Sequence, residues 1–450
     1  MDILMSVFLE QIIVYGFVFL LCAIIIVFYL RKKKNTSLEI IKKVVIAKEE
    51  GLFEPVSLHP YIDLNTCIGS AACVVECPEK DILGIVDGKA TVINTSNCVG
   101  HGACFHACPV EAITLRIGTE TRGVDLPHIN QNFETNIKGI YIAGELGGMG
   151  LIKNSVEQGQ QAIESILKSK KPSKEGVSDV IIIGAGPAGI SATLASKKHG
   201  LTSKTFEQDS LGGTVYTFPR AKIVMTSPMN LPLHGKVKLY DTSKDELLQL
   251  WNKVITDNNI VINENTKVEN IIPQQDGTFK VVTANGDEFL GNHVLISIGR
   301  RGSPRKLNIP GEVSTKVAYR LLEPERVSDK NIIVVVGGGD SAMEAAMLLK
   351  DDNNVTLLCR NDNFTRSKPK NRELINNCIE DNSLLVVFNS NLLSINDESC
   401  IYKVNDQEDS KQVKNDLVYI FAGGELPTKF LEKPGVKITK RFGYIMKKHS

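Results

Sequence analysis

DVIIIGAGPAGISATLASKKHGLTSKTFEQ, residues 179–208, combines a strand, a glycine loop and a helix in that order. The strand expected at 179–183 is apolar after its first residue, as in a strand covered on both faces of a parallel sheet. The loop Gly184-x-Gly186-x-x-Gly189, with Pro187 and Ala188 inside it, would bring backbone N–H groups and a helix N-terminus to a pyrophosphate. Glu207 ends the next strand, where a carboxylate usually takes ribose hydroxyls. The stretch therefore predicts a dinucleotide-binding α/β unit.

A second unit of the same kind, NIIVVVGGGDSAMEAAMLLK, occupies residues 331–350. Its glycine spacing ends in alanine, which is a known variant of the dinucleotide-binding loop. The loop residues expected at the nucleotide are Gly337, Gly339, Asp340, Ser341 and Ala342. The chain thus contains two dinucleotide-binding units in tandem.

The strand after the second loop, NVTLLCR, ends in Arg360, where an NAD site usually has an acid. Arg366 and Lys368 follow closely. Such a cationic cluster suits the 2′-phosphate of NADP. The alternative interpretation is a solvated basic loop, and the sequence favours NADPH over NADH without deciding between them.

The two units together resemble the flavoproteins with two dinucleotide-binding domains, and most closely the thioredoxin reductase-like branch of the pyridine nucleotide-disulfide oxidoreductase superfamily. Further matches support this. Leu211-Gly212-Gly213-Thr214 resembles the loop that meets the flavin ring. Residues 294–312, with Gly299, resemble the strand and turn that leave the FAD domain, and residues 416–431 resemble their counterpart in the NADP domain. The resemblance implies FAD and either NADPH or NADH as cofactors.

Two features depart from that family. Thioredoxin reductases carry a C-x-x-C pair just before the second loop, but residues 317–331 contain no cysteine. The family's return strand, which normally follows the second domain, here resembles GIYIAGE at 139–145, with Gly144 and with Glu145 in place of the usual aspartate. We therefore expect a circularly permuted FAD domain, in which strand 139–143 joins strand 179–183 in one sheet. The alternative is that residues 119–168 are an unrelated linker.

Six cysteines form two runs, CIGSAACVVECP at 67–78 and CVGHGACFHACP at 98–109. They resemble the runs of two-cluster bacterial ferredoxins, C-x2-C-x2-C-x3-C-P, in which the last cysteine ligates the other cluster. In each run the second cysteine is replaced. The resemblance assigns Cys67, Cys73 and Cys108 to one cluster, with Ser70 at its fourth iron. It assigns Cys98, Cys104 and Cys77 to the other, with His101 in the equivalent place.

The two replaced ligand positions, Ser70 and His101, leave three options open. Each cluster could be a three-iron species, could keep four irons with an oxygen or nitrogen ligand, or could take a solvent molecule or an outside ligand. Histidine in place of thiolate raises the potential in Rieske centres, so His101 would make its cluster easier to reduce. A further alternative is a ferredoxin fold that has lost one or both clusters.

The N-terminal segment is apolar. Residues 12–30 contain no charge, and Arg31-Lys32-Lys33-Lys34 follows at once. About 20 apolar residues span the hydrocarbon core of a bilayer, and the flanking cations predict that the long C-terminal part faces the cytoplasm. We expect a single-pass anchor in the cell membrane rather than a cleaved signal peptide or a buried soluble helix.

The 450 residues carry a formal net charge of +1, which gives no indication of nucleic-acid binding. The expected fold is α/β, with two Rossmann-like domains, a small α+β dicluster ferredoxin domain and one transmembrane helix. The expected boundaries are 1–34 for the anchor, 35–60 for a linker, 61–117 for the ferredoxin-like domain, 118–170 for the permuted FAD segment, 176–315 for the FAD domain and 316–450 for the NAD(P) domain.

These parts predict a membrane-anchored, flavin-dependent NAD(P)H oxidoreductase. Electrons would pass between NAD(P)H, FAD, the two clusters (4Fe-4S or 3Fe-4S) and a one-electron partner, either a redox protein or a membrane electron carrier, because flavin connects hydride donors to one-electron carriers. Flow in either direction and a homodimer are both compatible with the sequence. One alternative is a reductase of an organic substrate at the flavin, fed through the clusters. Another is a non-enzymatic membrane redox sensor or electron-carrier scaffold.

Overall fold

The computed structural model describes residues 2–49, 53, 55, 58–77, 79, 81–96, 98, 100, 102–148, 150–172, 174–218, 223–225, 228–239, 241–300, 302–336, 339–364, 367, 369–405, 407 and 409–448. The chain forms two compact units. One comprises Met1–Pro55, His59–Arg116 and Ile445–Ser450, and the other comprises Val56–Leu58 and Ile117–Tyr444. Each unit is described by itself below.

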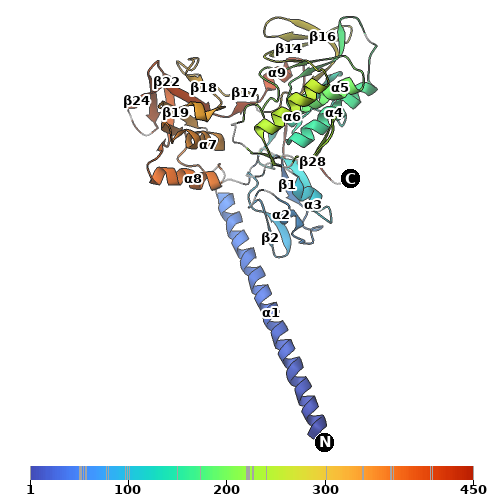
Figure 1. Ribbon diagram of the computed structural model, residues 1–450, viewed down its shortest axis with the longest axis vertical. Coiled ribbons are helices and arrows are strands. Elements are labelled where there is room, and N and C mark those ends of the chain that lie inside the picture. Colours follow the sequence, from blue (N-terminus) through green and yellow to red (C-terminus); the bar gives the residue numbers. More distant parts are fainter. Residues whose placement is uncertain are drawn as a thin grey trace. The chain divides into compact units, whose positions relative to one another are not determined.

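The first unit begins with α1 (Asp2–Glu49), a single helix of 48 residues (Figure 1). Large apolar side chains are exposed along it from Ile13 to Leu30, and in the described part of the chain it is the one helix long and apolar enough to cross a membrane. The helix does not end at the expected anchor boundary of residue 34, and most of the expected linker 35–60 is its continuation. The linker sequence is rich in Lys and Glu, which form helices well.

The ferredoxin-like part of this unit consists of short elements. They are β1 (Leu58–Ile62), α2 (Ala72–Val75), β2 (Leu83–Val86), β3 (Lys89–Val92), α3 (Ala103–Ala107) and β4 (Ile113–Ile117). β2 and β3 form an antiparallel hairpin, and β1 pairs with β4. The two cysteine runs repeat one backbone pattern, because Gly69 and Gly100 both have positive φ, as do Ala71 and Gly102 before the two short helices. The two cysteine runs therefore form an internal repeat in the backbone as well as in the sequence.

The end of the chain does not belong to the NAD(P)-binding part, contrary to the expected boundary of 316–450. β27 (Ile438–Arg441) pairs antiparallel with β5 (Val124–Pro127). β28 (Tyr444–Lys447) is the third strand of the sheet β1-β4-β28. Sequence patterning missed both pairings because the partner strands lie more than 300 residues away along the chain.

The FAD-binding part of the second unit is a sheet in the order β13-β8-β7-β16-β15-β14. Its strands are β7 (Val177–Ile183), β8 (Ser203–Phe206), β13 (Ile262–Asn263), β14 (Val268–Pro273), β15 (Phe279–Thr283) and β16 (Glu288–Ile296). The strands β7, β8, β13 and β16 are mutually parallel where they pair, and β14 and β15 form an antiparallel extension. The helices here are α4 (Ile152–Lys168), α5 (Pro187–Lys198) and α6 (Lys244–Asp257).

The segment upstream of the first glycine loop belongs to this same sheet. β6 (Ile140–Ile142) pairs parallel with the end of β16, and β7 pairs with the other edge of β16. α4 packs along α5, where the Ser191 hydroxyl donates to the carbonyl of Val156 at 2.7 Å. A Cβ atom added to Gly159 would stand 2.1 Å from the carbonyl oxygen of Ala188, so only glycine allows the two helices to come this close. The prediction that strand 139–143 shares a sheet with strand 179–183 is confirmed.

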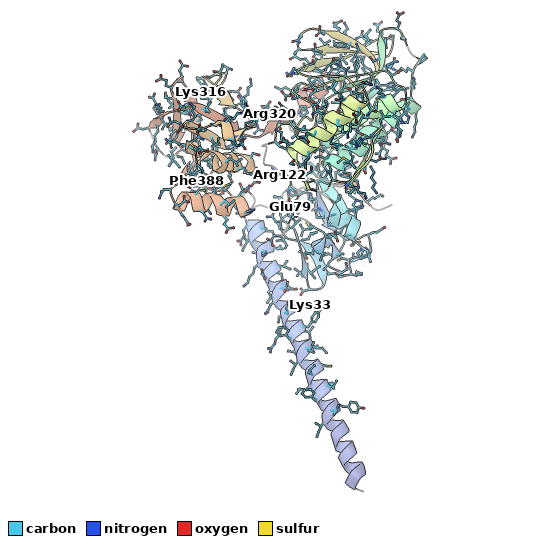
Figure 2. All side chains as sticks on the ribbon, viewed as in Figure 1. Lys33, Glu79, Arg122, Lys316, Arg320 and Phe388 are labelled. Atoms are coloured by element: carbon cyan, nitrogen blue, oxygen red, sulfur yellow. The ribbon has the colours of Figure 1, made fainter. Side chains whose placement is uncertain are left out.

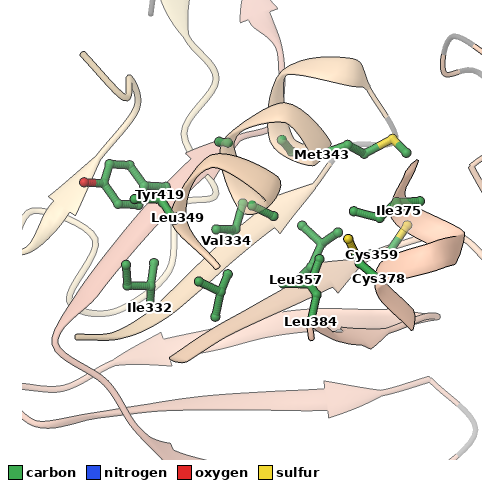
Figure 3. Packing of buried hydrophobic residues seen from close by; sticks show 14 of the residues in the cluster. Ile332, Val334, Met343, Leu349, Leu357, Cys359, Ile375, Cys378, Leu384 and Tyr419 are labelled. Carbon is green, nitrogen blue, oxygen red and sulfur yellow. The ribbon is translucent and has the colours of Figure 1, made fainter. Parts of the chain in front are cut away.

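The NAD(P)-binding part is a second parallel sheet, β18-β25-β19-β20-β21. Its elements are β18 (Val317–Ala318), β19 (Asn331–Val336), α7 (Asp340–Leu349), β20 (Asn354–Cys359), α8 (Pro369–Glu380), β21 (Leu385–Val387) and β25 (Leu417–Phe421). β22 (Ser390–Ile395), β23 (Ser399–Val404) and β24 (Ser410–Lys414) form an antiparallel sheet. One face of the parallel sheet packs on α7 and α8 through residues such as Val334, Met343 and Ile375 (Figure 3).

Smaller elements complete the second unit. They are η1 (Glu145–Gly147), β9 (Ile223–Met225), β10 (Met229–Leu231), β11 (Gly235–Val237), β12 (Asp241–Ser243), β17 (Ser303–Pro304), η2 (Pro324–Arg326), β26 (Gly424–Glu425) and α9 (Thr428–Glu432). β17 pairs with β26, so the two exits from the nucleotide-binding sheets are tied together.

Candidate functional site

The first glycine loop is tight toward the sheet and open above its middle residue. A Cβ atom on Gly184, which has φ +100, would stand 2.6 Å from the carbonyl oxygen of Ser297, and one on Gly189 would stand 1.8 Å from the carbonyl oxygen of Gly184. A Cβ atom on Gly186 would meet nothing within 4 Å. Gly186 caps α5, and Pro187 is its first residue. A helix N-terminus under an open glycine fits a pyrophosphate.

Glu207 lies beside this loop, as predicted. Its side chain is buried, with 6% exposed, and its carboxylate accepts hydrogen bonds from the backbone N–H groups of Ala185 at 2.7 Å and Asp209 at 3.1 Å. Burial raises the pKa of Glu207, and these two hydrogen bonds offset part of that effect. A buried acceptor at the end of the second strand fits the ribose of a dinucleotide.

The predicted flavin loop, Leu211–Thr214, lies against the glycine loop. The N–H of Gly212 donates to the carbonyl of Ala185 at 2.9 Å. A Cβ atom on Gly213 would stand 3.3 Å from the Cα atom of Gly186. Gly299, with φ +67, follows the end of β16, and a Cβ atom there would meet nothing within 4 Å. Loops far apart in sequence therefore meet at the carboxyl ends of β7 and β16, which is where open α/β sheets bind ligands.

The upstream segment contributes to the same place. The N–H of Gly144 donates to the side-chain oxygen of Gln158 at 2.8 Å, and a Cβ atom on Gly144 would stand 3.1 Å from the Cβ atom of Ala188. Glu145 opens η1 directly after it. α4 follows and begins at Ile152. The structure thus brings the predicted Gly144 to the first turn of α5, and Glu145 follows it directly.

Arg300 is a residue of this site that the sequence prediction missed. It follows Gly299 and lines a cavity with Asp125, Leu146, Leu431 and residues 426–428. Burial lowers the pKa of Arg300, while the charges of Glu145 and Asp125 oppose that effect. The sequence placed Arg300 in the turn within residues 294–312. Only the fold shows that it lies near the two carboxylates.

The second glycine loop is described in part. Gly339 caps α7, and a Cβ atom on it would meet nothing within 4 Å. In the first turn, Asp340 accepts a hydrogen bond from the side-chain amide of Asn371 at 2.8 Å. Ser341 is exposed, and Ala342 is buried against the sheet. Gly337 lies outside the described residues.

The predicted phosphate-binding cations are only partly located. Arg360 is exposed directly after β20. It stands at the end of the strand that follows the loop, which is the position expected for a residue that contacts the ribose or its 2′-phosphate. Arg366 and Lys368 lie outside the described residues.

In the ferredoxin-like part, one set of thiols surrounds a cavity. Cys67, Ser70, Cys73 and Cys108 line it together with apolar residues. Burial raises the pKa of the Cys73 thiol, and the neighbouring thiols of Cys67 and Cys108 raise it further. The backbone N–H groups of Ala90 and Ala112 point to the sulfur atoms of Cys67 at 3.4 Å and Cys108 at 3.3 Å. This set contains one cysteine from the other run, as the crossing pattern predicts.

The remaining three cysteines form the second set. Burial raises the pKa of the Cys104 thiol to about 12, and the neighbouring thiols of Cys98 and Cys77 raise it too. Burial likewise raises the pKa of the Cys98 thiol to about 11, with a further increase from Cys77. His101 lies outside the described residues. In the described part of the chain no three Cys, His or carboxylate side chains are close enough for a single metal ion. Two sets of three thiols fit polynuclear clusters instead.

Comparison with known families identifies the larger part of the chain. A profile of the family described as pyridine nucleotide-disulphide oxidoreductase matches residues 181–448, more than half of the sequence. The chain belongs to this family. A profile of the 4Fe-4S dicluster domain matches residues 59–109. Both predicted resemblances and the predicted fold class are thereby confirmed.

Several members of the family are similar in sequence. Bacilliredoxin reductase Bdr of Bacillus subtilis (strain 168) is 26% identical over 267 residues, which are 58% of this chain and 82% of that protein. Ferredoxin–NADP reductase 1 of Bacillus mycoides (strain KBAB4) is 31% identical over 165 residues, 36% of this chain and 44% of that protein. The chain therefore spans less than half the length of this second relative.

Among solved structures, bacillithiol disulfide reductase Bdr from Bacillus cereus has a TM-score of 0.50 and 23% identity, covering 59% of this chain and 84% of that one. This likeness concerns the fold alone. The family membership and the dicluster domain together make the protein an FAD-dependent NAD(P)H oxidoreductase with two iron–sulfur clusters.

Proposed function

We propose that this family member is a membrane-anchored oxidoreductase that exchanges electrons between NAD(P)H and a one-electron partner, by way of FAD and the two clusters. The observation that carries the proposal is the pair of three-thiol sets in a chain that lacks a cysteine pair at residues 317–331. Without that dithiol, the usual disulfide relay of thioredoxin reductases is missing, and the clusters are the evident route for electrons.

The chain's own groups divide the work of binding. Gly186 and the N-terminus of α5 would hold the FAD pyrophosphate, and Glu207 would accept the ribose hydroxyls. Gly339 and α7 would hold the nicotinamide dinucleotide in the same way. When bound, FAD and the clusters supply the conversion between two-electron hydride donors and single electrons. Hydride transfer needs no acid or base, so no catalytic side chain is assigned.

The partner and the place of action follow from the rest of the chain. α1 has the length and composition of a membrane anchor, and Arg31–Lys34 would keep the long C-terminal part on the cytoplasmic side. The name of the relative ferredoxin–NADP reductase supports a one-electron protein as partner. The same parts allow electrons to flow from a reduced carrier to NAD(P)⁺.

An anaerobic titration of the full-length protein in detergent tests this proposal. Adding NADPH should bleach the flavin absorption and produce electron paramagnetic resonance signals of reduced clusters. The variants Cys73→Ala and Cys104→Ala should keep flavin reduction by NADPH but lose electron delivery to a one-electron acceptor. Clusters that stay oxidised beside a fully reduced flavin would contradict the proposal.

A second candidate function is reduction of a disulfide directly at the flavin. The observation favouring it is the relative bacilliredoxin reductase, 82% of which is covered by this chain. One measurement distinguishes the two functions. If the protein reduces disulfides at the flavin, it should reduce oxidised bacilliredoxin with NADPH. The variants Cys73→Ala and Cys104→Ala should then do so as fast as the wild-type protein.

A further inference from the structure

α1 continues as a helix well beyond its uncharged stretch. From Leu30 to Glu49 it runs 19 further residues without a break, and at 1.5 Å per residue this is about 28 Å. This part of α1 carries Arg31–Lys34 first and then a face that packs on the ferredoxin-like part. The height of a contact above the end of the uncharged stretch therefore follows from the residue of α1 at which the contact is made.

The hairpin β2–β3 runs down this helix toward its uncharged stretch. The amino group of Lys43 contacts the carboxylate of Asp81 at 2.7 Å, and a Cβ atom on Gly84 would stand 2.9 Å from the Ile40 side chain. Further down, the Ser37 hydroxyl accepts a hydrogen bond from the N–H of Asp87 at 3.3 Å. Figure 1 shows β2 beside α1.

The turn of this hairpin reaches the level of the basic residues. A Cβ atom on Gly88 would stand 3.9 Å from the amino nitrogen of Lys33, which Figure 2 labels on α1. Lys33 is three residues beyond Leu30, so this level is about 4.5 Å above the end of the uncharged stretch. The headgroup layer of a leaflet is about 5–8 Å thick. The turn therefore lies at headgroup height.

The loop that holds the first thiol set touches this turn. A Cβ atom on Gly69 would stand 1.9 Å from the carbonyl oxygen of Gly88, so the two backbones are in contact. The Lys89 amino group donates to the carbonyl of Cys67. Cys67 and its neighbours are thus fixed to the lowest part of the hairpin, close to the level of Lys33.

The side chains of this loop suit a lipid surface. Ile68 is 64% exposed and Leu64 is 55% exposed, both in the short stretch that leads into the cavity of Cys67 and Ser70. Exposed aliphatic side chains beside a cationic band match the interface of a bilayer with anionic lipids, where the apolar part enters the headgroup layer and the cations meet phosphates.

We propose that the loop 64–70 rests in the headgroup layer of the membrane, so that the thiol set of Cys67, Cys73 and Cys108 faces the bilayer. This inference rests on the proposed membrane anchor. Ser70 is exposed and lines that cavity, and in this arrangement it is the position of the set nearest the lipid. A carrier that collects electrons from this set must then approach within the plane of the membrane.

Tryptophan quenching by lipids tests this surface. Three full-length variants, Ile68→Trp, Val45→Trp and Phe19→Trp, are reconstituted in vesicles of phosphatidylcholine and phosphatidylglycerol, with or without bromine on the upper part of the acyl chains. The emission of the buried native Trp251 is common to all and is subtracted. Phe19→Trp reports the anchor, and Val45→Trp, 15 residues beyond Leu30, is the control about 22 Å above the uncharged stretch.

We expect brominated lipid to remove much of the added emission of Phe19→Trp and Ile68→Trp and to leave that of Val45→Trp unchanged. Quenching of Phe19→Trp alone overturns the inference while the anchor stands. No quenching of Phe19→Trp overturns both. Electron paramagnetic resonance checks that Ile68→Trp keeps its clusters. If this variant loses them, Leu64→Trp replaces it as the reporter of the loop, with the same expected quenching.

Discussion

Four donors converge on the carboxylate of Glu312, in the connection between the two nucleotide-binding parts. They are the N–H groups of Leu307 at 2.7 Å, Asn308 at 2.6 Å and Ile309 at 3.4 Å and the hydroxyl of Tyr319 at 2.7 Å. Burial by itself would raise the pKa of Glu312, but these hydrogen bonds outweigh it and hold the pKa below its usual value. Burial, and then the bond to Glu312, raise the pKa of Tyr319 to about 12. One side chain thus fixes the path of the connection.

The Glu312→Gln variant should be less stable at neutral pH by about 1–2 kcal/mol, because hydrogen bonds to a charged acceptor are the stronger ones. A carboxyl with a lowered folded pKa stabilises above its unfolded pKa, and this contribution is lost as the pH falls through the folded pKa. The difference in Tm between wild type and variant should therefore be constant above about pH 5.5 and shrink below about pH 4.5. The exposed Glu325→Gln is the matched control, and an equal loss of Tm in both variants would contradict this role.

At the second nucleotide site, we predict that Arg360 favours NADPH through a single charge. The Arg360→Glu variant removes a phosphate partner and adds repulsion, so the KM for NADPH should rise by one to two orders of magnitude, roughly, and that for NADH should change little. Steady-state kinetics with both nucleotides provides the measurement. Lys411→Glu, on the exposed strand β24, controls for the general change in charge. Equal effects on both nucleotides would remove the NADP assignment.

At the scale of elements, the two halves of the ferredoxin-like part exchange a cysteine. α2 and α3 are related by the internal repeat, but the cavity at α2 contains Cys108, which follows α3. Cys77, which follows α2, lies with Cys98 and Cys104. Each half therefore needs the other to complete its thiol set.

Variants of cysteines from opposite runs should consequently lose the same cluster. Cys73→Ala and Cys108→Ala should remove the same electron paramagnetic resonance signal, and Cys77→Ala and Cys104→Ala should remove the other, because the exchanged cysteine belongs to the opposite run. Iron content should fall by one cluster in each variant. Cys378→Ala, in the NAD(P)-binding core, is the control. Pairing of Cys73 with Cys77 would contradict the crossing arrangement.

β6 and α4 stand before the glycine loop in sequence but inside its domain in space. Ile163 and Ile166 of α4 are buried in the same cluster as Ala188 and Ala192 of α5. Burial of each such side chain contributes about 1.5–3 kcal/mol. A domain that loses this helix and the strand beside β16 exposes its core.

A fragment of residues 176–450 should therefore fold poorly and retain no FAD, whereas a fragment of residues 118–450 should bind FAD. Flavin content after gel filtration and the near-ultraviolet circular dichroism signal compare the two. If the shorter fragment binds FAD as tightly as the full chain, residues 119–168 are only a linker.

At the scale of the whole molecule, one helix serves both as candidate anchor and as part of a folded unit. Ser37 and Ala47 of α1 are buried, although they lie beyond the apolar stretch. Removing the anchor and removing the helix are therefore different operations, and the boundary matters for any soluble form of the protein.

A chain beginning at residue 35 should be soluble without detergent and keep FAD and both clusters, because it retains the contacts of α1 with β2. A chain beginning at residue 52 should keep FAD but lose iron, since Ile40 and Ser37 no longer cover β2. Iron and flavin contents per chain, measured after anaerobic purification, distinguish the two. Full iron content in the shorter chain would show that α1 contributes nothing to the clusters.

The sequence by itself determined the chemistry of this protein. Glycine loops, an acid or a cation at the end of the next strand, and spaced cysteines are local signals, because each depends on residues close together in the chain. From them followed both nucleotide-binding units, the two thiol sets, the apolar helix and even the displaced strand at 139–143. Arg300 beside Glu145, the pairing of β27 with β5, the addition of β28 to the ferredoxin sheet and the docking of α1 on β2 were decided only by the tertiary structure. Each of these joins segments far apart in the chain, and backbone hydrogen bonding and burial leave no local pattern that names the partner.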